Sequence, residues 1–182
     1  MKEPPKTSLE WAFISIGSNI SPEKYLPLAI SKLHPLGKFL KTSCVYQNPA
    51  VGRPEQEDFL NAAVLLDTAL PPLEIRNHLR KIEKDLDRVR TEDKFAARTI
   101  DLDLCILGKQ ILDLAEITLP DPDLLTRAHL AVTIAELAPD FHHPITGEAL
   151  WRIADRLRAG ANLTLREDVT KQIQQAAQAP SA

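Results

Sequence analysis

The spacing of hydrophobic and polar positions predicts where helices and strands lie along the chain. Residues 11–16 form a short apolar run that ends at Gly17-Ser18-Asn19, as expected of a strand followed by a turn. Ser21-Pro22 then has the residue types that open a helix. From Pro72 onward, apolar residues recur at steps of four and three, which is the spacing of one helical face. The apolar positions of this second helix are Ile75, Leu79, Ile82, Leu86 and Val89.

Three further segments have the composition of strands. Residues 39–46 and 59–66 are rich in β-branched, aromatic and aliphatic side chains, and the prolines and glycine of 48–54 predict a long loop between them. Residues 100–107 are predicted to be a strand, and Ile111-Leu112 is expected to be a short strand that pairs with it.

Helices are also predicted at 130–137 and 149–157, so the order of elements is β-α-β-β-α-β with a helical C-terminal addition. This order is typical of a ferredoxin-like α+β fold, an antiparallel sheet with helices packed on one side. We expect a single domain over residues 10–158. Residues 1–9 and 161–182 have too few large apolar side chains for a core and are expected to be flexible termini.

Composition and charge narrow the class of protein. The chain has 182 residues, is 44% hydrophobic and has no apolar run near the roughly 18 residues of a membrane helix, so one soluble domain is expected. A net charge of -3 argues against bulk attraction to nucleic acid or anionic membranes. No secretory signal is apparent, which makes a cytoplasmic location the expectation. Cys44 and Cys105 lack metal-ligand spacing and are expected to be core or strand thiols, not a disulfide.

The strongest candidate for chemistry is the segment Arg98-Thr99-Ile100-Asp101-Leu102-Asp103. Residues two apart in a strand share a face, so Asp101 and Asp103 are expected to project together while the apolar residues between them enter the core. Two carboxylates that face the same small space repel each other unless a cation neutralises them. Their spacing suits Mg²⁺ that carries substrate phosphates. A solvated strand face and a solvated charged loop remain the alternatives. The nearby cationic residues expected to meet phosphate are Arg88, Arg90, Lys94 and Arg98.

Five separated motifs add to this picture. They are Gly17-Ser18-Asn19, Tyr46 with Pro49, Val51 and Gly52, the run Asp58 to Ala62, Ile82-Glu83 with Arg88-Val89-Arg90, and Arg98 to Asp103. In their order and spacing they resemble the 6-hydroxymethyl-7,8-dihydropterin pyrophosphokinase family, whose signature is Arg-x-x-Asp-x-Asp. The resemblance covers about residues 10–158.

The resemblance implies a specific reaction. It is the transfer of the β,γ-pyrophosphate of ATP to the hydroxymethyl group of the dihydropterin, which yields the diphosphate and AMP in folate synthesis. Two Mg²⁺ ions held by Asp101 and Asp103 are implied, and paired metals suit an in-line displacement. The implied partners are the small molecules pterin and ATP, with no nucleic acid and no membrane, and the implied state is a monomer. The implied catalytic residues are Arg88, Arg98, Asp101 and Asp103.

The resemblance also implies which residues contact each substrate. Without it, Glu83 is equally well an i,i+3 ion-pair partner of Arg80, while Phe59 and Asn61 would be a core aromatic and a strand-edge amide. The loop around Pro49 and the loop 88–97 are implied to be lids that exclude water. The residues implied to contact ATP are Glu83, Arg88, Arg90, Arg98, Asp121 and Arg127. Those implied to contact the pterin are Asn48, Pro49, Val51, Phe59, Asn61 and His129.

Several positions depart from the family pattern, among them Ala96-Ala97 in place of Gly-Pro and Asp87 in place of glycine. Asp121 replaces a histidine expected to touch ATP phosphates, which predicts weaker nucleotide binding. His129 replaces an aromatic that stacks on the pterin and is expected to titrate near neutral pH, and Phe95 replaces a tryptophan. The alternatives to an active pyrophosphokinase are a non-catalytic or substrate-shifted paralogue and a metal-dependent phosphoesterase. The complete set of carboxylates and arginines favours the active enzyme.

Overall fold

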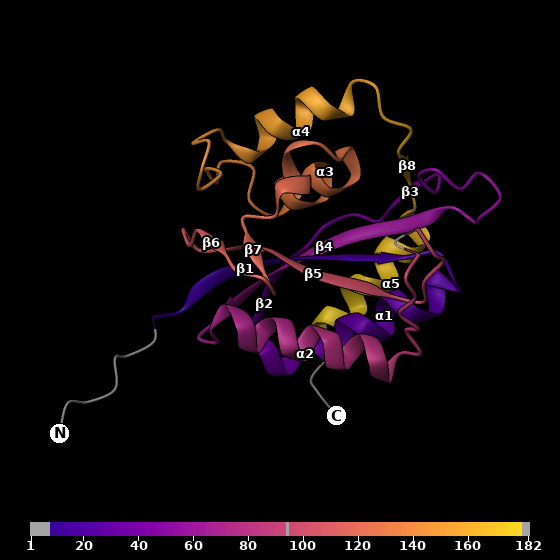
Figure 1. The fold of residues 1–182 in the computed structure, drawn as a ribbon, viewed down its shortest axis with the longest axis horizontal. Coiled ribbons are helices and arrows are strands. Elements are labelled where there is room, and N and C mark those ends of the chain that lie inside the picture. The colour runs from indigo at the N-terminus through magenta and orange to yellow at the C-terminus, as the bar shows by residue number, and fades with distance from the viewer. Residues whose placement is uncertain (1–7, 94, 180–182) are drawn as a thin grey trace.

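The structure, a computed structural model, describes residues 8–93 and 95–179 (Figure 1). Within these ranges every helix is too short or too polar to cross a bilayer. The strands are β1 (Glu10–Ser18), β2 (Lys38–Thr42), β3 (Tyr46–Asn48), β4 (Phe59–Thr68), β5 (Asp101–Leu107), β6 (Leu112–Asp113), β7 (Thr118–Leu119) and β8 (Thr164–Leu165). The helices are α1 (Pro22–Leu33), α2 (Pro72–Asp85), α3 (Ala128–Leu137), α4 (Leu150–Arg158) and α5 (Glu167–Gln178), with 3₁₀ turns η1 (His34–Leu36) and η2 (Pro122–Leu125).

An antiparallel sheet forms the centre of the molecule. Its strands follow the order β5-β1-β4-β3-β8, and β2 also pairs with β4. In this register Gly17 of β1 lies between Asp101 of β5 and Asn61 of β4. One row further along, Ser15 lies opposite Asp103. Residues that pair directly across a sheet point to the same face, so small side chains on β1 leave open space beside both carboxylates.

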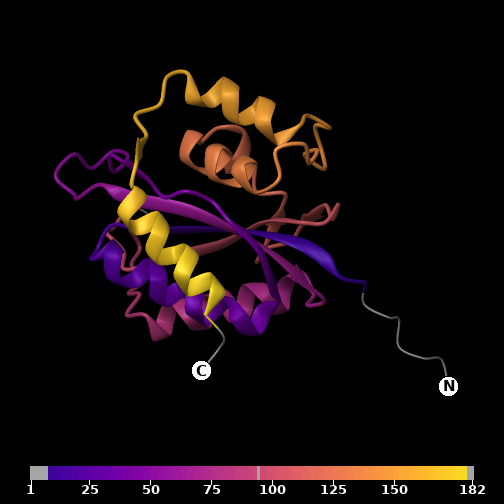
Figure 2. The same ribbon diagram turned by 180° about the vertical axis from the view of Figure 1, so that it is seen from behind.

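Helices cover both faces of this sheet (Figures 1 and 2). One core lies between the sheet and α1, α2 and α5, and it includes Ile14 and Leu102. The other lies between the sheet and α3 and α4, and it includes Phe13 and Cys105. The prediction that helices pack on one side was therefore wrong. Residues 12–14 are fully buried without a polar position among them, which is the pattern of a strand covered on both faces.

The C-terminal segment is part of the fold, contrary to the expected flexible tail at 161–182. Strand β8 pairs with β3, and α5 lies beside α1 (Figure 2). Val169 and Ile173, four residues apart on α5, are fully buried in the same core as α1. The Oγ1 of Thr170 accepts a hydrogen bond of 2.8 Å from the backbone N–H of Val45. Two large apolar residues on one helical face suffice to dock the helix, although the segment as a whole is polar. Residues 1–7 and 180–182 lie outside the described residues, as does Lys94, which was expected to meet phosphate.

The segment 39–46, predicted as one strand, is interrupted in the structure. Strands β2 and β3 both pair with β4 but are separated at Ser43–Val45. The Ser43 backbone N–H donates to the Ala63 carbonyl, and the Ser43 hydroxyl accepts from the Ala63 N–H at 2.8 Å. The Ser43 side chain thus takes the place of a backbone carbonyl in the hydrogen bonding between strands. Sequence composition does not reveal this interruption.

Two predicted boundaries also change. Helix α2 ends at Asp85, and Val89, predicted on its apolar face, is 74% exposed. The backbone turns away because Asp87 adopts a positive φ of 63° and the Arg88 N–H donates to the Glu83 carbonyl at 3.0 Å. Leu112 pairs with Leu119 of β7, not with β5 as expected. Both cysteines are free thiols, as predicted.

Candidate active site

The two signature carboxylates project from the same face of β5. Leu102 between them and Ile100 before them are buried in the core, whereas Asp101 and Asp103 line a cavity of about 350 Å³. The alternation predicted from the sequence is therefore present. The cavity lies between the sheet and the segment that leads into α3, and its wall includes Asp121, Arg127 and His129.

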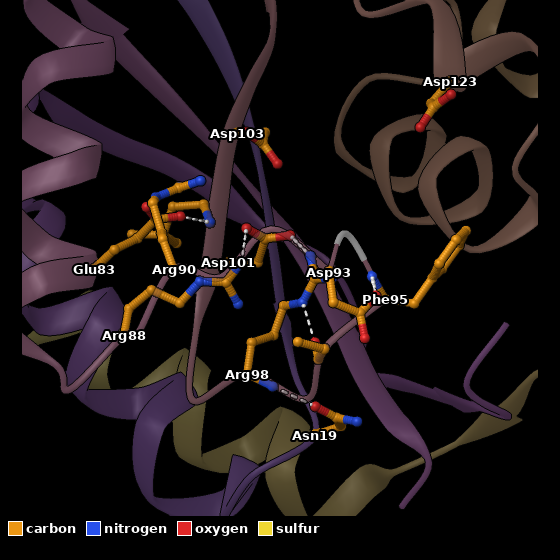
Figure 3. Close-up of polar contacts among 12 residues, drawn as sticks. Asn19, Glu83, Arg88, Arg90, Asp93, Phe95, Arg98, Asp101, Asp103 and Asp123 are labelled. Carbon is orange, nitrogen blue, oxygen red and sulfur yellow. Dashed lines mark hydrogen bonds and ion pairs between the residues drawn. The ribbon is translucent and has the colours of Figure 1, made fainter. Parts of the chain in front are cut away.

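Guanidinium groups lie near both carboxylates, and Figure 3 shows those of Arg88 and Arg98 beside Asp101. Arg98 Nη1 lies 2.6 Å from one oxygen of Asp101, and Arg88 Nη2 lies 3.6 Å from the other. Arg80 Nη2 lies 3.6 Å from Asp103. Although 43% of its side chain is exposed to the cavity, the protein atoms around Asp103 desolvate it. This desolvation, with the Asp101 charge as a second cause, raises the pKa of Asp103 to about 6.

Glu83 is buried below these groups and does not line the cavity. Its carboxylate lies 2.9 Å from Arg80 and 2.6 Å from Arg90, and it accepts a hydrogen bond of 2.9 Å from the Leu102 backbone N–H. Burial raises the pKa of Glu83, whereas the Leu102 N–H and Arg80 lower it. These partners occupy both oxygens of Glu83 in this structure, and the nucleoside contact stays a prediction. Glu83 fixes α2 to β5 and orients two arginines, which agrees with the alternative of an i,i+3 pair.

The arginines implied to contact ATP have different environments. Arg88 is 11% exposed in its side chain, and its Nε has no hydrogen-bond partner among the described residues. Burial lowers the pKa of Arg88, although Asp101 raises it. The Arg90 side chain is 53% exposed, forms an ion pair with Glu83 and does not line the cavity. Arg98 and Arg127 line the cavity, and Arg127 forms an ion pair of 2.8 Å with Asp123.

Most residues implied to contact the pterin line the same cavity. The Asn61 side-chain amide donates a 2.6 Å hydrogen bond to Asn48 Oδ1, and the Arg98 guanidinium lies over the Phe59 ring at 5.6 Å. A Cβ on Gly17 would lie 2.9 Å from Asn61 Oδ1, so glycine is needed for this approach. The cavity is lined by Asn48, Val51, Phe59, Asn61 and His129, but not by Pro49.

Two of the departures from the family pattern, Asp121 and His129, lie on the wall near α3. Asp121 caps η2 by accepting a 2.9 Å hydrogen bond from the Asp123 N–H, and burial raises its pKa. Burial and then the nearby Arg127 charge lower the pKa of His129 to about 4. The expectation that His129 titrates near neutral pH was therefore wrong. Its ring is neutral at pH 7 and offers a flat, uncharged surface to the cavity.

The two loops expected to act as lids contact each other. Arg53 Nη2 lies 2.6 Å from Asp93, and the Gln56 amide donates to the Phe95 carbonyl at 2.9 Å. Arg80 and Gln56 are the site residues that sequence reasoning missed. Arg80 had appeared only as a partner of Glu83, and Gln56 occupies a loop position with no sequence signal.

Comparison with known proteins identifies the family. A family model described as 7,8-dihydro-6-hydroxymethylpterin-pyrophosphokinase (HPPK) matches residues 13–139. The chain belongs to the HPPK family. It is 34% identical over 167 residues to 2-amino-4-hydroxy-6-hydroxymethyldihydropteridine pyrophosphokinase of Synechocystis sp., which covers 84% of this chain and 85% of that protein. It is 35% identical over 140 residues to the folic acid synthesis protein fol1 of Pneumocystis carinii, covering 76% of this chain but 19% of the larger protein.

The fold also matches solved HPPK structures. A crystal structure of wild-type Plasmodium falciparum HPPK-DHPS aligns with a TM-score of 0.62 at 11% identity, over 84% of this chain and 45% of that one. At this identity the match concerns the fold alone. The HPPK family carries out pyrophosphoryl transfer to hydroxymethyldihydropterin in folate synthesis with ATP as co-substrate. A site for this reaction has to accept a planar heterocycle and a triphosphate together.

Proposed function

We propose that this chain is an active, Mg²⁺-dependent pyrophosphokinase that converts 6-hydroxymethyl-7,8-dihydropterin and ATP to the pterin diphosphate and AMP. The observation that carries this proposal is the position of Asp101 and Asp103. Both line one cavity together with Arg98, Phe59 and Asn61, and the Arg88 guanidinium lies 3.6 Å from Asp101. A binding module that held only a pterin would not need two adjacent carboxylates and their arginines.

The residues present fit a divalent cation. Asp101 and Asp103 offer oxygen ligands on the same face of β5, which is the ligand type that Mg²⁺ prefers. The raised pKa of Asp103 means that its charged form lacks stabilisation, and a cation would provide it. Bound Mg²⁺ would stabilise the negative charge of the transferred phosphoryl oxygens.

The other residues would bind and orient the two substrates. Arg98 and Arg88 lie within 3.6 Å of Asp101, so their guanidinium groups can reach phosphate oxygens placed beside this carboxylate. Phe59 and the neutral His129 would stack on the pterin, and Asn61 would bond its polar edge. Pyrophosphoryl transfer requires the hydroxyl oxygen to approach phosphorus in line, so positioning and charge stabilisation account for catalysis without a covalent enzyme intermediate.

The finer architecture is also part of the proposal. The sheet order and antiparallel pairing support a ferredoxin-like βαββαβ unit that forms one domain from residue 10 onward. Because α5 packs in the main core, we extend this domain to residue 178 instead of ending it at 158. The proposed active form is a monomer, because one chain supplies pterin-side and phosphate-side residues to the same cavity. Size-exclusion chromatography with light scattering tests that state.

A coupled assay for AMP release tests the function. Purified protein is incubated with ATP, Mg²⁺ and 6-hydroxymethyl-7,8-dihydropterin, and AMP and the pterin diphosphate are quantified by chromatography. Formation of both products in equal amounts is the expected result. Tight pterin binding without AMP would instead indicate a non-catalytic paralogue. Phosphate release from simple phosphate esters would indicate a phosphoesterase.

The carboxylate roles are tested by Asp101→Asn and Asp103→Asn. Each substitution keeps the size of the side chain and removes the charge that would hold Mg²⁺, so we expect turnover to fall by about 10³-fold or more. Circular dichroism and the melting temperature should show a folded protein. Asp113→Asn, on the exposed strand β6, is the matched control and should keep full activity. Wild-type turnover in either cavity variant would contradict the metal assignment.

A further inference from the structure

The C-terminal segment 164–178 lies along the edge of β3 that β4 leaves open (Figure 1). Strand β8 pairs with this edge, and both backbone groups of Val45, directly before β3, bond to the same segment. The Val45 carbonyl accepts a 2.8 Å hydrogen bond from the Arg166 N–H, and the Val45 N–H donates to Thr170 Oγ1. The match to the family model ends at residue 139, so it assigns no role to this segment.

Strand β3 is the direct neighbour of residues on the pterin side of the site. In its register with β4, Asn48 pairs with Phe59 and Tyr46 pairs with Asn61. Asn48 also accepts the 2.6 Å hydrogen bond of the Asn61 amide, and both side chains line the cavity. A strand of three residues makes few hydrogen bonds of its own, so its position depends on the segments that hold its two edges. A shift of β3 would move the Asn48 oxygen that orients Asn61.

The Gln47 side chain connects the C-terminal segment to both of these strands. Its Oε1 accepts a 3.1 Å hydrogen bond from Arg166 Nη1, and its Nε2 donates at 2.9 Å to Asp58 Oδ2. Gln47 directly precedes Asn48, and Asp58 directly precedes Phe59. One carboxamide, which donates and accepts at once, thus links Arg166 to the two residues next to the pterin contacts.

The Arg166 guanidinium is itself held in place. Its Nη2 lies 3.2 Å from Glu23 of α1 and 2.8 Å from Asp168, and 26% of its side chain is exposed. Val169 and Ile173, which follow it on α5, are fully buried in the core. Arg166 therefore reaches Gln47 from a docked helix and with its orientation set by two carboxylates.

We propose that Arg166 is a positioning residue for the pterin side of the site, which acts by holding Gln47 and with it strand β3. This inference rests on the proposed function. Polar groups that are already oriented lose less conformational freedom when a ligand binds, so loosening β3 should weaken pterin binding. The carboxylates that would hold Mg²⁺ lie on β5, at the opposite end of the sheet order from β8, so nucleotide binding should change little.

The experiment compares the affinities for the two substrates by calorimetry. The Kd of 6-hydroxymethyl-7,8-dihydropterin is measured with a saturating α,β-methylene analogue of ATP plus Mg²⁺, and the Kd of the analogue is measured separately. Arg166→Ala should raise the pterin Kd about 10-fold and change the analogue Kd less than about 2-fold. Lys171→Ala, which removes a positive charge from an exposed position of α5, is the matched control and should leave both values unchanged.

A double-mutant cycle tests the route through Gln47. Gln47→Ala should raise the pterin Kd by a factor similar to that of Arg166→Ala. The variant with both substitutions should be no weaker than either single variant within about 2-fold, because all three remove the same connection. Additive losses in the double variant would show that Arg166 acts by another route and would overturn the proposal.

The remaining outcomes separate positioning from general support of the fold. An unchanged pterin Kd in a folded Arg166→Ala variant would overturn the proposal, and so would an equal rise in both Kd values. If Arg166→Ala does not fold, Gln47→Ala decides by the same comparison. Absence of pterin binding to the natural chain would also overturn it. AMP release tests the proposed function separately, so a pterin Kd that depends on Arg166 without AMP release would reject catalysis and retain the inference.

Discussion

Asp121 shows how one residue can set nucleotide affinity. Its carboxylate lines the cavity and caps η2 through the Asp123 N–H, at a position where the resemblance implies a histidine. Asp121→His should lower the Michaelis constant for ATP about 5-fold, equivalent to roughly 1 kcal/mol, because repulsion of the triphosphate is removed. Asp121→Asn, which keeps the capping oxygen, should give a smaller decrease. An unchanged or higher constant would show that the site is built around the aspartate.

His129 should make the folded state sensitive to acid. Its pKa is about 4 in the folded protein, because of burial and Arg127, and about 6.5 when unfolded. The unfolded chain therefore binds more protons between these values, so the free energy of unfolding falls as the pH drops from about 6.5 to 4. Over the whole interval between the two pKa values, the free energy of unfolding should fall by up to about 3 kcal/mol.

The measurement compares urea unfolding of the natural chain and His129→Phe at pH 7 and pH 4.5. The variant lacks the titrating group and should lose less stability on acidification. His78→Phe, at a histidine with 43% of its side chain exposed, is the matched control. An identical loss of stability in the natural chain and His129→Phe would contradict this assignment.

At the scale of elements, α5 is the clearest case in which composition misleads. Its core contacts come from Val169 and Ile173, which are fully buried. Ile173→Ala should lower the free energy of unfolding by about 2–4 kcal/mol, because it removes buried methyl groups and leaves a cavity. Gln174→Ala, on the exposed side of the same helix, should change it by less than about 0.5 kcal/mol. A negligible effect of Ile173→Ala would indicate that α5 does not dock in solution.

The elements that sequence patterns predicted correctly have strong periodicity of their own. The alternation around Asp101 and the four-and-three spacing from Ile75 to Ile82 each identify a buried face from local sequence. The end of α2 and the break at Ser43 depend on backbone contacts with other segments, which no local pattern contains. The buried partners of Glu83 belong to this second group, because Arg90 and Leu102 reach it only in the folded chain.

At the scale of the whole molecule, the two helical layers share a single sheet. Neighbouring residues of β1, such as Phe13 and Ile14, belong to opposite cores. Loss of either layer would expose one face of the same strand, so the layers should unfold together. Tryptophan fluorescence reports on the α3 and α4 layer, because Trp151 lies on α4 and Trp11 contacts Phe141.

Urea unfolding tests this cooperativity. Midpoints from tryptophan fluorescence and from far-ultraviolet circular dichroism, which reports on all helices, should coincide within error. Separate midpoints would show that the α3 and α4 layer unfolds independently. In that case the cavity wall that carries Asp121 and His129 would be lost before the rest of the fold.

Strand β4 has a consequence beyond the native state. Every residue from Leu60 to Leu66 is buried, and Asn61 is the one polar side chain among them. Such a segment is rich in side chains that favour cross-β stacking, and in a denatured chain it would be free to pair with its copy in another molecule. Heating at high protein concentration should therefore end in precipitation. The lifetime of the activity would then depend on the rate of unfolding and not on the equilibrium between folded and unfolded protein.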